Sequence, residues 1–468
     1  MRALMVQGAS SSAGKSLLTT ALARLLHRRG IDVAPFKAQN MSNNARVVAG
    51  GEIGTAQYLQ ALAAGLEPEV RMNPILVKPE GDNQSQVVVL GKPDLELSRL
   101  PWRERPAALW PVIERSLQRL RAEHELLLLE GAGSPAEINL QDTDLANMRT
   151  AQAADARVLL VCDIDRGGAF AHLYGTWALL PAHDRERIAG FVLNKFRGDP
   201  ALLPPAPEQL EQHTGVRTLG VLPWLEHGLP DEDGAATPNP QLGRGSVAVV
   251  RYPTAPNLDE FKQLEQVADL HWLDSPQGVN GTQLLILPGS KHVAADLAWL
   301  KQTGLADAVC AHAASGRPVL GICGGMQMLG ERVDDEAGVD GSGQGLGLLP
   351  LATAFARSKQ TTKTTSRFQT LAEPWAQLTG KTISGYQIHH GRTETTGSFA
   401  EALPEQLGFV SGPVLGIYLH GLFEQPELLV ALFGAAPRRS LEQAFDELAD
   451  AVEAHIDIDA ILTEIGTP

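Results

Sequence analysis

Short apolar segments alternate with amphipathic segments along the first half of the 468-residue chain. Residues 2–7 (RALMVQ) are apolar, and the apolar positions of residues 15–30 (KSLLTTALARLLHRRG) recur with the period of a helix that ends in glycine. Further apolar segments occupy residues 31–37, 124–133, 156–165 and 187–196. Strands that are apolar on both faces are typical of a parallel sheet covered by helices on each side. The pattern therefore predicts an α/β domain.

This first pattern ends at residues 218–223 (TLGVLP), so we place the first domain at residues 1–223. Residues 224–245 are rich in Pro, Gly, Asn and Asp and have no periodicity, which is typical of a linker. A second α/β pattern follows and predicts a domain at residues 246–436. Residues 437–468 are acidic with helical periodicity, and we expect this helical segment to pack on the second domain.

Composition excludes several classes of protein. Apolar residues make up 44% of the chain, and 39 basic against 54 acidic residues give a formal charge of −15. Such a charge disfavours nucleic-acid binding and attachment to an anionic membrane surface. No stretch approaches the roughly 18 apolar residues of a membrane span, and the apolar run at the N-terminus is too short for a signal peptide. We therefore expect a cytoplasmic protein, and the sequence leaves open whether it forms a homo-oligomer.

The segment GASSSAGKS follows the first apolar run and precedes the first helix. A phosphate-binding loop needs backbone N–H groups, a helix N-terminus, a lysine for the phosphate oxygens and a hydroxyl for Mg²⁺. Five residues rather than the common four separate the two glycines, but the strand–loop–helix context fits. We predict that nucleotide is bound by Gly8, Ser12, Ala13, Gly14, Lys15 and Ser16.

Two acidic residues are candidates for Mg²⁺ alongside the Ser16 hydroxyl. Glu130 ends the apolar segment LLLLE, at the edge of the sheet where α/β proteins bind ligands. An unpaired carboxylate would be costly there, which favours a metal or a cationic partner. Glu52 (GGEIG) is a weaker candidate, for which a solvated carboxylate at a helix start is an equally good interpretation.

Three more residues follow apolar segments. Asn194 lies at the end of the apolar segment GFVLNK, where its amide is placed to contact a purine. Arg197 stands where a guanine-binding N-K-x-D motif has aspartate, so guanine specificity is not supported. Lys37 (PFKAQN) and Lys78 (NPILVKP) lie beside polar residues, and we predict that they hold a substrate carboxylate or the transferred phosphoryl group. The alternative for each lysine is a surface side chain with a buried stem.

The segment PVLGICGGMQMLG predicts a strand, a sharp glycine turn and a helix, with Cys323 at the turn. A helix N-terminus favours a thiolate, and backbone N–H groups beside small residues bind an oxyanion. We predict Cys323 as a nucleophile, with oxyanion donors at Gly324 and at Gly289 (LPGS). The other two cysteines, Cys162 and Cys310, fit buried structural positions, and the chain has no C-x-x-C metal motif.

A nucleophilic thiolate needs a base. His420 (GIYLHGLF) ends another apolar segment and is our candidate, with His389 and His390 (GYQIHHG) as competitors. The sequence thus predicts two sites, one for nucleotide and one for acyl transfer.

Ten motifs together carry a resemblance to a known family across residues 1 to about 425. They are GASSSAGKS, PFKAQNMSNN, MNPILVKP, LEGAGSPAEINL, CDIDRGGAF, VLNKFRGD, LPGSK, GICGGMQMLG, GYQIHHGRT and YLHGLF. They occur in the order found in the cobyric acid synthase family of glutamine-hydrolysing amidotransferases. The first half resembles P-loop proteins of the dethiobiotin-synthetase type, and the second half resembles class I (flavodoxin-like) glutamine amidotransferase domains.

The resemblance implies an ATP-dependent amide ligase domain at residues 1–223 and a glutamine amidotransferase domain at residues 246–436. It implies amidation of the b, d, e and g carboxylates of the corrinoid (adenosyl)cobyrinic acid a,c-diamide, with ATP, Mg²⁺ and glutamine as the ammonia donor. It makes Cys323 the glutaminase nucleophile and His420 its base. Most class I enzymes have glutamate two residues after the histidine, where this chain has Leu422, so a dyad is expected and Glu424 is an open candidate for orienting His420.

Carboxylates are poor electrophiles, so the first domain must form an acyl phosphate that ammonia from the second domain attacks. We expect ammonia to pass between the two sites without entering bulk water, where it would be protonated. The alternatives are a cobyrinic acid a,c-diamide synthase, a lipid II amidotransferase, or a P-loop ATPase with a degenerate amidotransferase-like module. The motifs PFKAQNMSNN and CDIDRGGAF favour a cobyric acid synthase over a cobyrinic acid a,c-diamide synthase.

Overall fold

The computed structural model describes residues 2–81, 84–229 and 245–466, which form two compact units. One unit comprises Met1–Glu232 with Arg439–Pro468, and the other comprises Asp233–Arg438. Most of the linker predicted at residues 224–245 therefore lies outside the described residues. Among the described helices, none is both long and apolar enough to span a bilayer.

The first unit is built on a six-stranded sheet in the order β12-β11-β10-β1-β9-β2, in which every neighbouring pair is parallel. The strands are β1 (Arg2–Gly8), β2 (Val33–Phe36), β9 (Leu126–Glu130), β10 (Arg157–Asp163), β11 (Ile188–Phe196) and β12 (Thr218–Pro223). Each coincides with a predicted apolar segment, so the parallel sheet is confirmed. Its carboxyl edge gathers the ends of β1, β9, β10 and β11.

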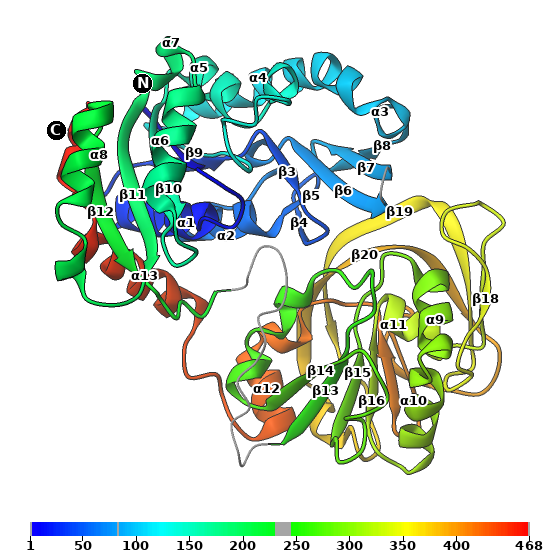
Figure 1. Ribbon diagram of the computed structural model, residues 1–468. Coiled ribbons are helices and arrows are strands. Elements are labelled where there is room, and N and C mark those ends of the chain that lie inside the picture. The colour runs from blue at the N-terminus through cyan, green and yellow to red at the C-terminus, as the bar shows by residue number, and fades with distance from the viewer. Residues whose placement is uncertain (1, 82–83, 230–244, 467–468) are drawn as a thin grey trace. The chain divides into compact units, whose positions relative to one another are not determined.

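Successive residues of these strands enter different cores on the two faces of the sheet. Met5 and Leu129 pack on one face beneath α4 (Arg105–Glu123), α5 (Met148–Ala154), α6 (Ala169–Leu179) and α8 (Ala206–Thr214). Leu4 and Leu128 pack on the other face with α1 (Lys15–Arg28), α2 (Thr55–Ala63), α13 (Leu441–His455) and α14 (Ile458–Glu464). Helices thus cover both faces (Figure 1), which is why the strands are apolar at consecutive positions.

The C-terminal helices belong to the first unit, so the expectation that they pack on the second domain is wrong. Phe445 and Leu448 of α13 are buried in the same core as Leu22 of α1. Arg24 of α1 also forms an ion pair with Asp446 at 2.7 Å. The helical periodicity identified the apolar face of α13 but did not indicate which sheet that face covers.

Two small sheets flank the main sheet of the first unit and were not predicted. One has the order β3-β6-β7-β8, and the other pairs β4 with β5. Their strands are β3 (Gln39–Met41), β4 (Ala45–Val48), β5 (Gly51–Gly54), β6 (Ile75–Gly81), β7 (Gln84–Val89) and β8 (Lys92–Asp94). The short helices α3 (Leu95–Arg99) and α7 (Ala182–Arg185) complete the unit.

The second unit contains a seven-stranded sheet in the order β14-β13-β15-β16-β23-β22-β21. The first five are parallel in the flavodoxin-like order 2-1-3-4-5, and β22 and β21 add an antiparallel edge. The strands are β13 (Ser246–Val250), β14 (Asp269–Leu273), β15 (Leu284–Leu287), β16 (Val319–Ile322), β21 (Ala400–Leu403), β22 (Gly408–Ser411) and β23 (Val414–Ile417). The flavodoxin-like fold class is confirmed.

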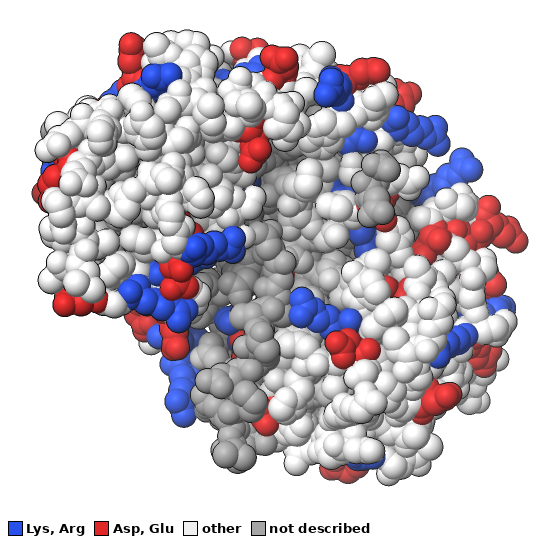
Figure 2. All heavy atoms as spheres, in the orientation of Figure 1, with Lys and Arg blue, Asp and Glu red and all other residues white. Residues whose placement is uncertain are grey.

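A second sheet of this unit, β18-β17-β19-β20, is dominated by a long antiparallel hairpin. Its strands are β17 (Arg332–Asp334), β18 (Gly343–Gln344), β19 (Leu351–Arg367) and β20 (Thr382–Thr395). The helices of the unit are α9 (Val293–Gln302), α10 (Leu305–Ala314), α11 (Gly324–Leu329) and α12 (Pro426–Phe433). Acidic and basic side chains are interspersed on the face of the molecule drawn in Figure 2.

Candidate functional sites in the two units

The GASSSAGKS segment forms the turn between β1 and α1, and α1 begins at Lys15. Gly14, just before the helix, has φ +96°, and a Cβ there would lie 1.9 Å from the side-chain nitrogen of Asn194. Only glycine fits this position. The Lys15 Nζ folds back over the loop and donates to the carbonyl oxygens of Ser10 and Gly133, each at 3.3 Å. These contacts fix the lysine over the loop, and its contact with phosphate stays a prediction.

Two residues at the end of β11 donate hydrogen bonds to backbone carbonyls of the loop. The Asn194 Nδ2 donates to the carbonyl of Ala13 at 2.9 Å, and the Lys195 Nζ donates to the carbonyl of Ser12 at 2.7 Å. Lys195 also forms an ion pair with the buried Asp163 at 3.0 Å. Asn194 therefore supports the loop, and its contact with a purine stays a prediction. Sequence reasoning missed Lys195 and Asp163, although both end apolar strands.

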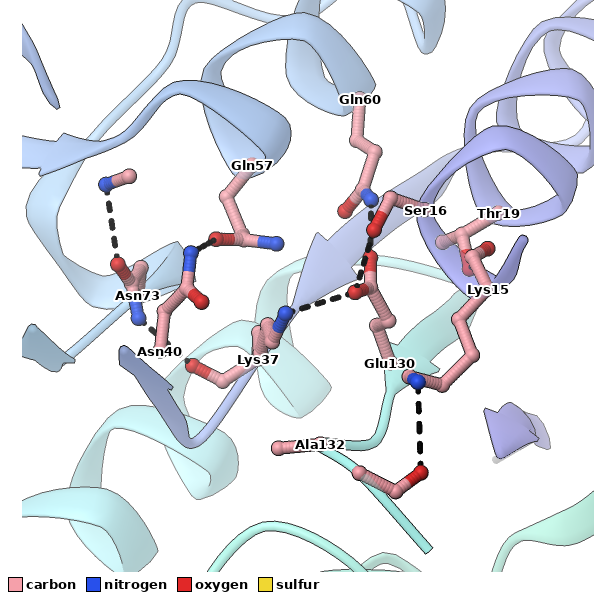
Figure 3. Close-up of polar contacts among 12 residues, drawn as sticks. Lys15, Ser16, Thr19, Lys37, Asn40, Gln57, Gln60, Asn73, Glu130 and Ala132 are labelled. Carbon is pink, nitrogen blue, oxygen red and sulfur yellow. Dashed lines mark hydrogen bonds and ion pairs between the residues drawn. The ribbon is translucent and has the colours of Figure 1, made fainter. Parts of the chain in front are cut away.

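The Glu130 carboxylate ends β9 and is fully buried beside the loop (Figure 3). Oε1 accepts from the Ser16 hydroxyl at 2.8 Å and from the Lys37 ammonium at 2.7 Å, and Oε2 accepts from the Gln60 amide. The buried charge is thus compensated by a cation and two neutral donors. The structure brings together Ser16 and Glu130, which the sequence analysis grouped as candidate Mg²⁺ ligands, with Lys37, which it predicted for substrate, and adds Gln60, which it missed.

Glu52 and Lys78 form a second buried ion pair in this unit. Their side chains are 0% and 7% exposed, and Lys78 Nζ lies 2.7 Å from Glu52 Oε2. The solvated interpretation of Glu52 and the surface interpretation of Lys78 are wrong. Their predicted roles toward metal and substrate stay predictions, because each charge is already compensated by the other.

In the second unit, Cys323 lies between β16 and α11 at a sharp turn. Its backbone has φ +51° and ψ −108°, a strained conformation for a residue with a Cβ and one found at nucleophile elbows. A Cβ at Gly324 would lie 2.7 Å from the backbone nitrogen of Ser290, so the turn packs closely on the loop after β15. The Cys323 Sγ lies 3.7 Å from the carbonyl of Ile388. The predicted strand–turn–helix context is confirmed.

His420, just after β23, is 2% exposed, and Glu260 is fully buried against it. The Glu260 Oε1 lies 3.0 Å from the His420 Nδ1, and Oε2 accepts from the backbone N–H of Gly421 at 3.1 Å. Burial opposes a charge on His420, but the Glu260 carboxylate and hydrogen bonding to Cys323 outweigh it and raise the pKa of His420 to about 10. Cys323, His420 and Glu260 therefore form one interacting set.

Glu260 is the carboxylate that contacts His420, where Leu422 replaces the usual glutamate. It lies in a 3₁₀ turn at Leu258–Phe261, 160 residues before His420, whereas Glu424 is exposed. A Cβ at Gly289 would lie 2.8 Å from the His420 ring, so the predicted oxyanion residue borders the site. Sequence reasoning missed Glu260 because no spacing rule links it to the motif of Cys323 or to that of His420.

The competing residues are placed differently. Burial lowers the pKa of His389 to about 4, and its ring stacks on Tyr418 at 3.9 Å. The His390 Nδ1 lies 3.0 Å from the carbonyl of Ala356. Burial raises the pKa of Cys162 to about 11, in the middle of the first unit. These environments favour structural roles.

The two folds and their sites define a P-loop nucleotide-binding unit joined to a glutamine amidotransferase unit. Residues 4–229 match the model of the CobQ/CobB/MinD/ParA nucleotide binding domain, and residues 246–428 match that of the CobB/CobQ-like glutamine amidotransferase domain. The second match spans Glu260, Cys323 and His420.

Curated relatives named cobyric acid synthase match this chain over almost its full length. The cobyric acid synthase of Polaromonas sp. strain JS666 is 52% identical to this chain, and the alignment covers 100% of this chain and 99% of the relative. Those of Variovorax paradoxus strain S110 and Polaromonas naphthalenivorans strain CJ2 are 54% and 52% identical, with 97% of this chain and 98% of each relative aligned. The chain belongs to the cobyric acid synthase family. It is an enzyme, a glutamine-dependent amidating ligase.

Proposed function

We propose that this chain uses ATP, Mg²⁺ and glutamine to convert the b, d, e and g carboxylates of (adenosyl)cobyrinic acid a,c-diamide into amides, giving cobyric acid. The substrate is thus a corrinoid with several peripheral carboxylates. The observation that carries the proposal is the presence in one chain of a P-loop serine bonded to a buried glutamate and of a cysteine, histidine and glutamate in contact.

The first unit would activate each carboxylate. A carboxylate oxygen attacks the γ-phosphorus of ATP, the bond to the β-phosphate oxygen breaks, and an acyl phosphate and ADP form. Lys15 neutralises charge on the transferred group. Lys37 lies next to the same site because its ammonium contacts the Glu130 carboxylate. The Ser16 hydroxyl and the Glu130 carboxylate, 2.8 Å apart, are the hard oxygen ligands that Mg²⁺ prefers. The bound metal would neutralise charge developing on the phosphates.

The second unit would release ammonia from glutamine. With a pKa of about 10, His420 is protonated at neutral pH, and an imidazolium stabilises a neighbouring thiolate. The Cys323 thiolate attacks the amide carbon of glutamine, and Gly289 and Gly324 are the predicted donors to the resulting oxyanion. His420 gives its proton to the departing ammonia and takes a proton from the water that hydrolyses the thioester. Glu260 holds the ring in position throughout.

A Cys323→Ala variant tests the proposal. Mass spectrometry of the diamide after incubation with ATP, Mg²⁺ and glutamine should show four successive losses of about 1 Da per molecule with the wild-type chain. The variant should form no amide from glutamine and should form amides when ammonium salts replace it. Absence of amidation by the wild-type chain, or glutamine-driven amidation by the variant, would contradict the proposal.

A further inference from the structure

Two neighbouring amide side chains of the first unit each have one polar atom without a hydrogen-bond partner in the part of the chain that the structure describes. Gln57 and Gln60 are three residues apart on α2 and therefore share one face of the helix. Both are fully buried. The Gln57 Nε2 and the Gln60 Oε1 have no hydrogen-bond partner among the residues that the structure describes. Figure 3 shows these two atoms directed toward the same region, beside the Lys37–Glu130 pair.

The orientation of the Gln60 amide follows from its neighbour. The Glu130 carboxylate only accepts hydrogen bonds, so the Gln60 atom that faces it must be Nε2, and the carbonyl Oε1 is the atom left over. The Gln57 Oε1 accepts from the Asn40 Nδ2 at 3.0 Å, which leaves its Nε2 as a donor that no described residue accepts from. An unpaired donor and an unpaired acceptor, both buried, are costly unless a small ligand satisfies them.

The chemistry of the pair limits what that ligand is. It must carry a lone pair for the Gln57 N–H and a hydrogen for the Gln60 carbonyl, and it must be small because both amides are buried. Neutral ammonia has both groups, whereas the ammonium ion has no lone pair and would present a hydrogen to the Gln57 N–H. The pair therefore favours neutral ammonia over the ammonium ion, and water, which also carries a lone pair and hydrogens, is the competing occupant.

We infer that Gln57 and Gln60 form a receiving site for neutral ammonia in the ligase unit, beside the centre where the carboxylate is activated. This inference rests on the proposed function. Ammonia leaves the pair when its lone pair forms the C–N bond with the acyl phosphate. The C–O bond to the phosphate then breaks, and the phosphate takes the electron pair and the proton lost by nitrogen. Gln57 and Gln60 act as positioning residues and exchange no protons.

The test uses the full-length chain with Cys323→Ala, ATP, Mg²⁺ and the diamide, and ammonium chloride as the only nitrogen source. Gln57→Met and Gln60→Met, each added to this background, keep the side-chain volume and remove the polar atoms. We expect each to raise the KM for ammonia by about tenfold or more, the effect of one lost hydrogen bond. The KM values for ATP and the diamide should stay within about twofold. The matched control is Gln118→Met, on the exposed face of α4.

A pH series separates the two forms of ammonia. If the neutral form binds, the KM expressed as total ammonia should fall about tenfold for each unit by which the pH rises toward the pKa of ammonium, and the KM expressed as neutral ammonia should stay constant. A KM constant in total ammonia would overturn the inference, as would variants that match the control because water alone fills the site. Parallel changes in the KM for ammonia, ATP and the diamide would indicate a structural role and also overturn it.

Two controls keep the result interpretable. Gln57→Met leaves every contact of Glu130 intact, so it decides the question if Gln60→Met fails to fold. Failure of the wild-type chain to amidate the diamide would overturn the proposed function and this inference together. Normal amidation with an unchanged KM for ammonia in both variants would overturn this inference alone.

Discussion

The Glu260 carboxylate lies 3.0 Å from the His420 Nδ1, and both side chains are buried. The second oxygen of Glu260 accepts from the backbone N–H of Gly421, so the carboxylate is held at two points. It reaches the histidine from the segment after β13, although the residue two positions after His420 is leucine. The glutaminase unit therefore has a carboxylate in contact with its histidine, although Leu422 stands where most class I enzymes have glutamate.

Glu260→Gln should abolish most of the glutaminase activity. The neutral amide still accepts a hydrogen bond from His420 but no longer stabilises the imidazolium, so we expect kcat for glutamine hydrolysis to fall roughly 10³–10⁴-fold. Amidation driven by ammonium chloride should remain. Glu424→Gln, which changes an exposed carboxylate in the same way, is the matched control and should stay within about twofold of wild type. Equal losses in the two variants would contradict the assignment.

The same pair makes stability depend on pH in a defined direction. The pKa of His420 in the folded chain, about 10, lies above the ordinary value near 6.5. The folded state therefore keeps a proton that the unfolded state loses, and stability is full below about pH 6.5 and is lost as pH rises through about 10. Urea unfolding of the second unit should show a falling free energy of unfolding between pH 7 and 10. That slope should be shallower in Glu260→Gln, and identical slopes would refute the role of the pair.

Gly14→Ala should disable the phosphate-binding loop. The added Cβ would meet the Asn194 amide at 1.9 Å, in a backbone conformation with φ +96°. We expect a fluorescent ATP analogue to bind roughly 30-fold or more weakly, a cost of about 2 kcal/mol. Gly30→Ala is the control, because Gly30 also has positive φ (+78°) but has nothing within 4 Å of a new Cβ. It should lower stability by about 1 kcal/mol without changing nucleotide affinity.

Phe445→Ala tests which unit the C-terminal helices stabilise. Phe445 is fully buried in the core that α13 shares with α1, so its loss should destabilise the nucleotide-binding unit by about 3–5 kcal/mol. Denaturant unfolding monitored by nucleotide binding should report this loss, and glutaminase activity should persist at denaturant concentrations that unfold the first unit. Glu447→Ala on the exposed side of α13 should cost about 1 kcal/mol or less. Loss of glutaminase stability instead would show that the helix supports the other unit.

The sequence by itself determined the parallel strands of the two main sheets and the local form of each motif. A strand buried on both faces is apolar at consecutive positions, and a glycine turn that leads into a helix lies within a few residues of the strand that precedes it. Lys15, Glu130, Cys323 and His420 each end or follow such a strand, so they were found without coordinates. Parallel strands share one carboxyl edge, which is why these residues were expected to meet within each unit.

Only the tertiary structure decided which distant segments complete the sites. Glu260 reaches His420 across 160 residues, Gln60 reaches Glu130 from α2, the helix that follows the β4–β5 pair, and α13 covers the sheet of the first unit. Hydrophobic periodicity states that a face is buried but not what buries it. A buried carboxylate or amide finds its partner through the path of the chain in space, which local spacing does not encode.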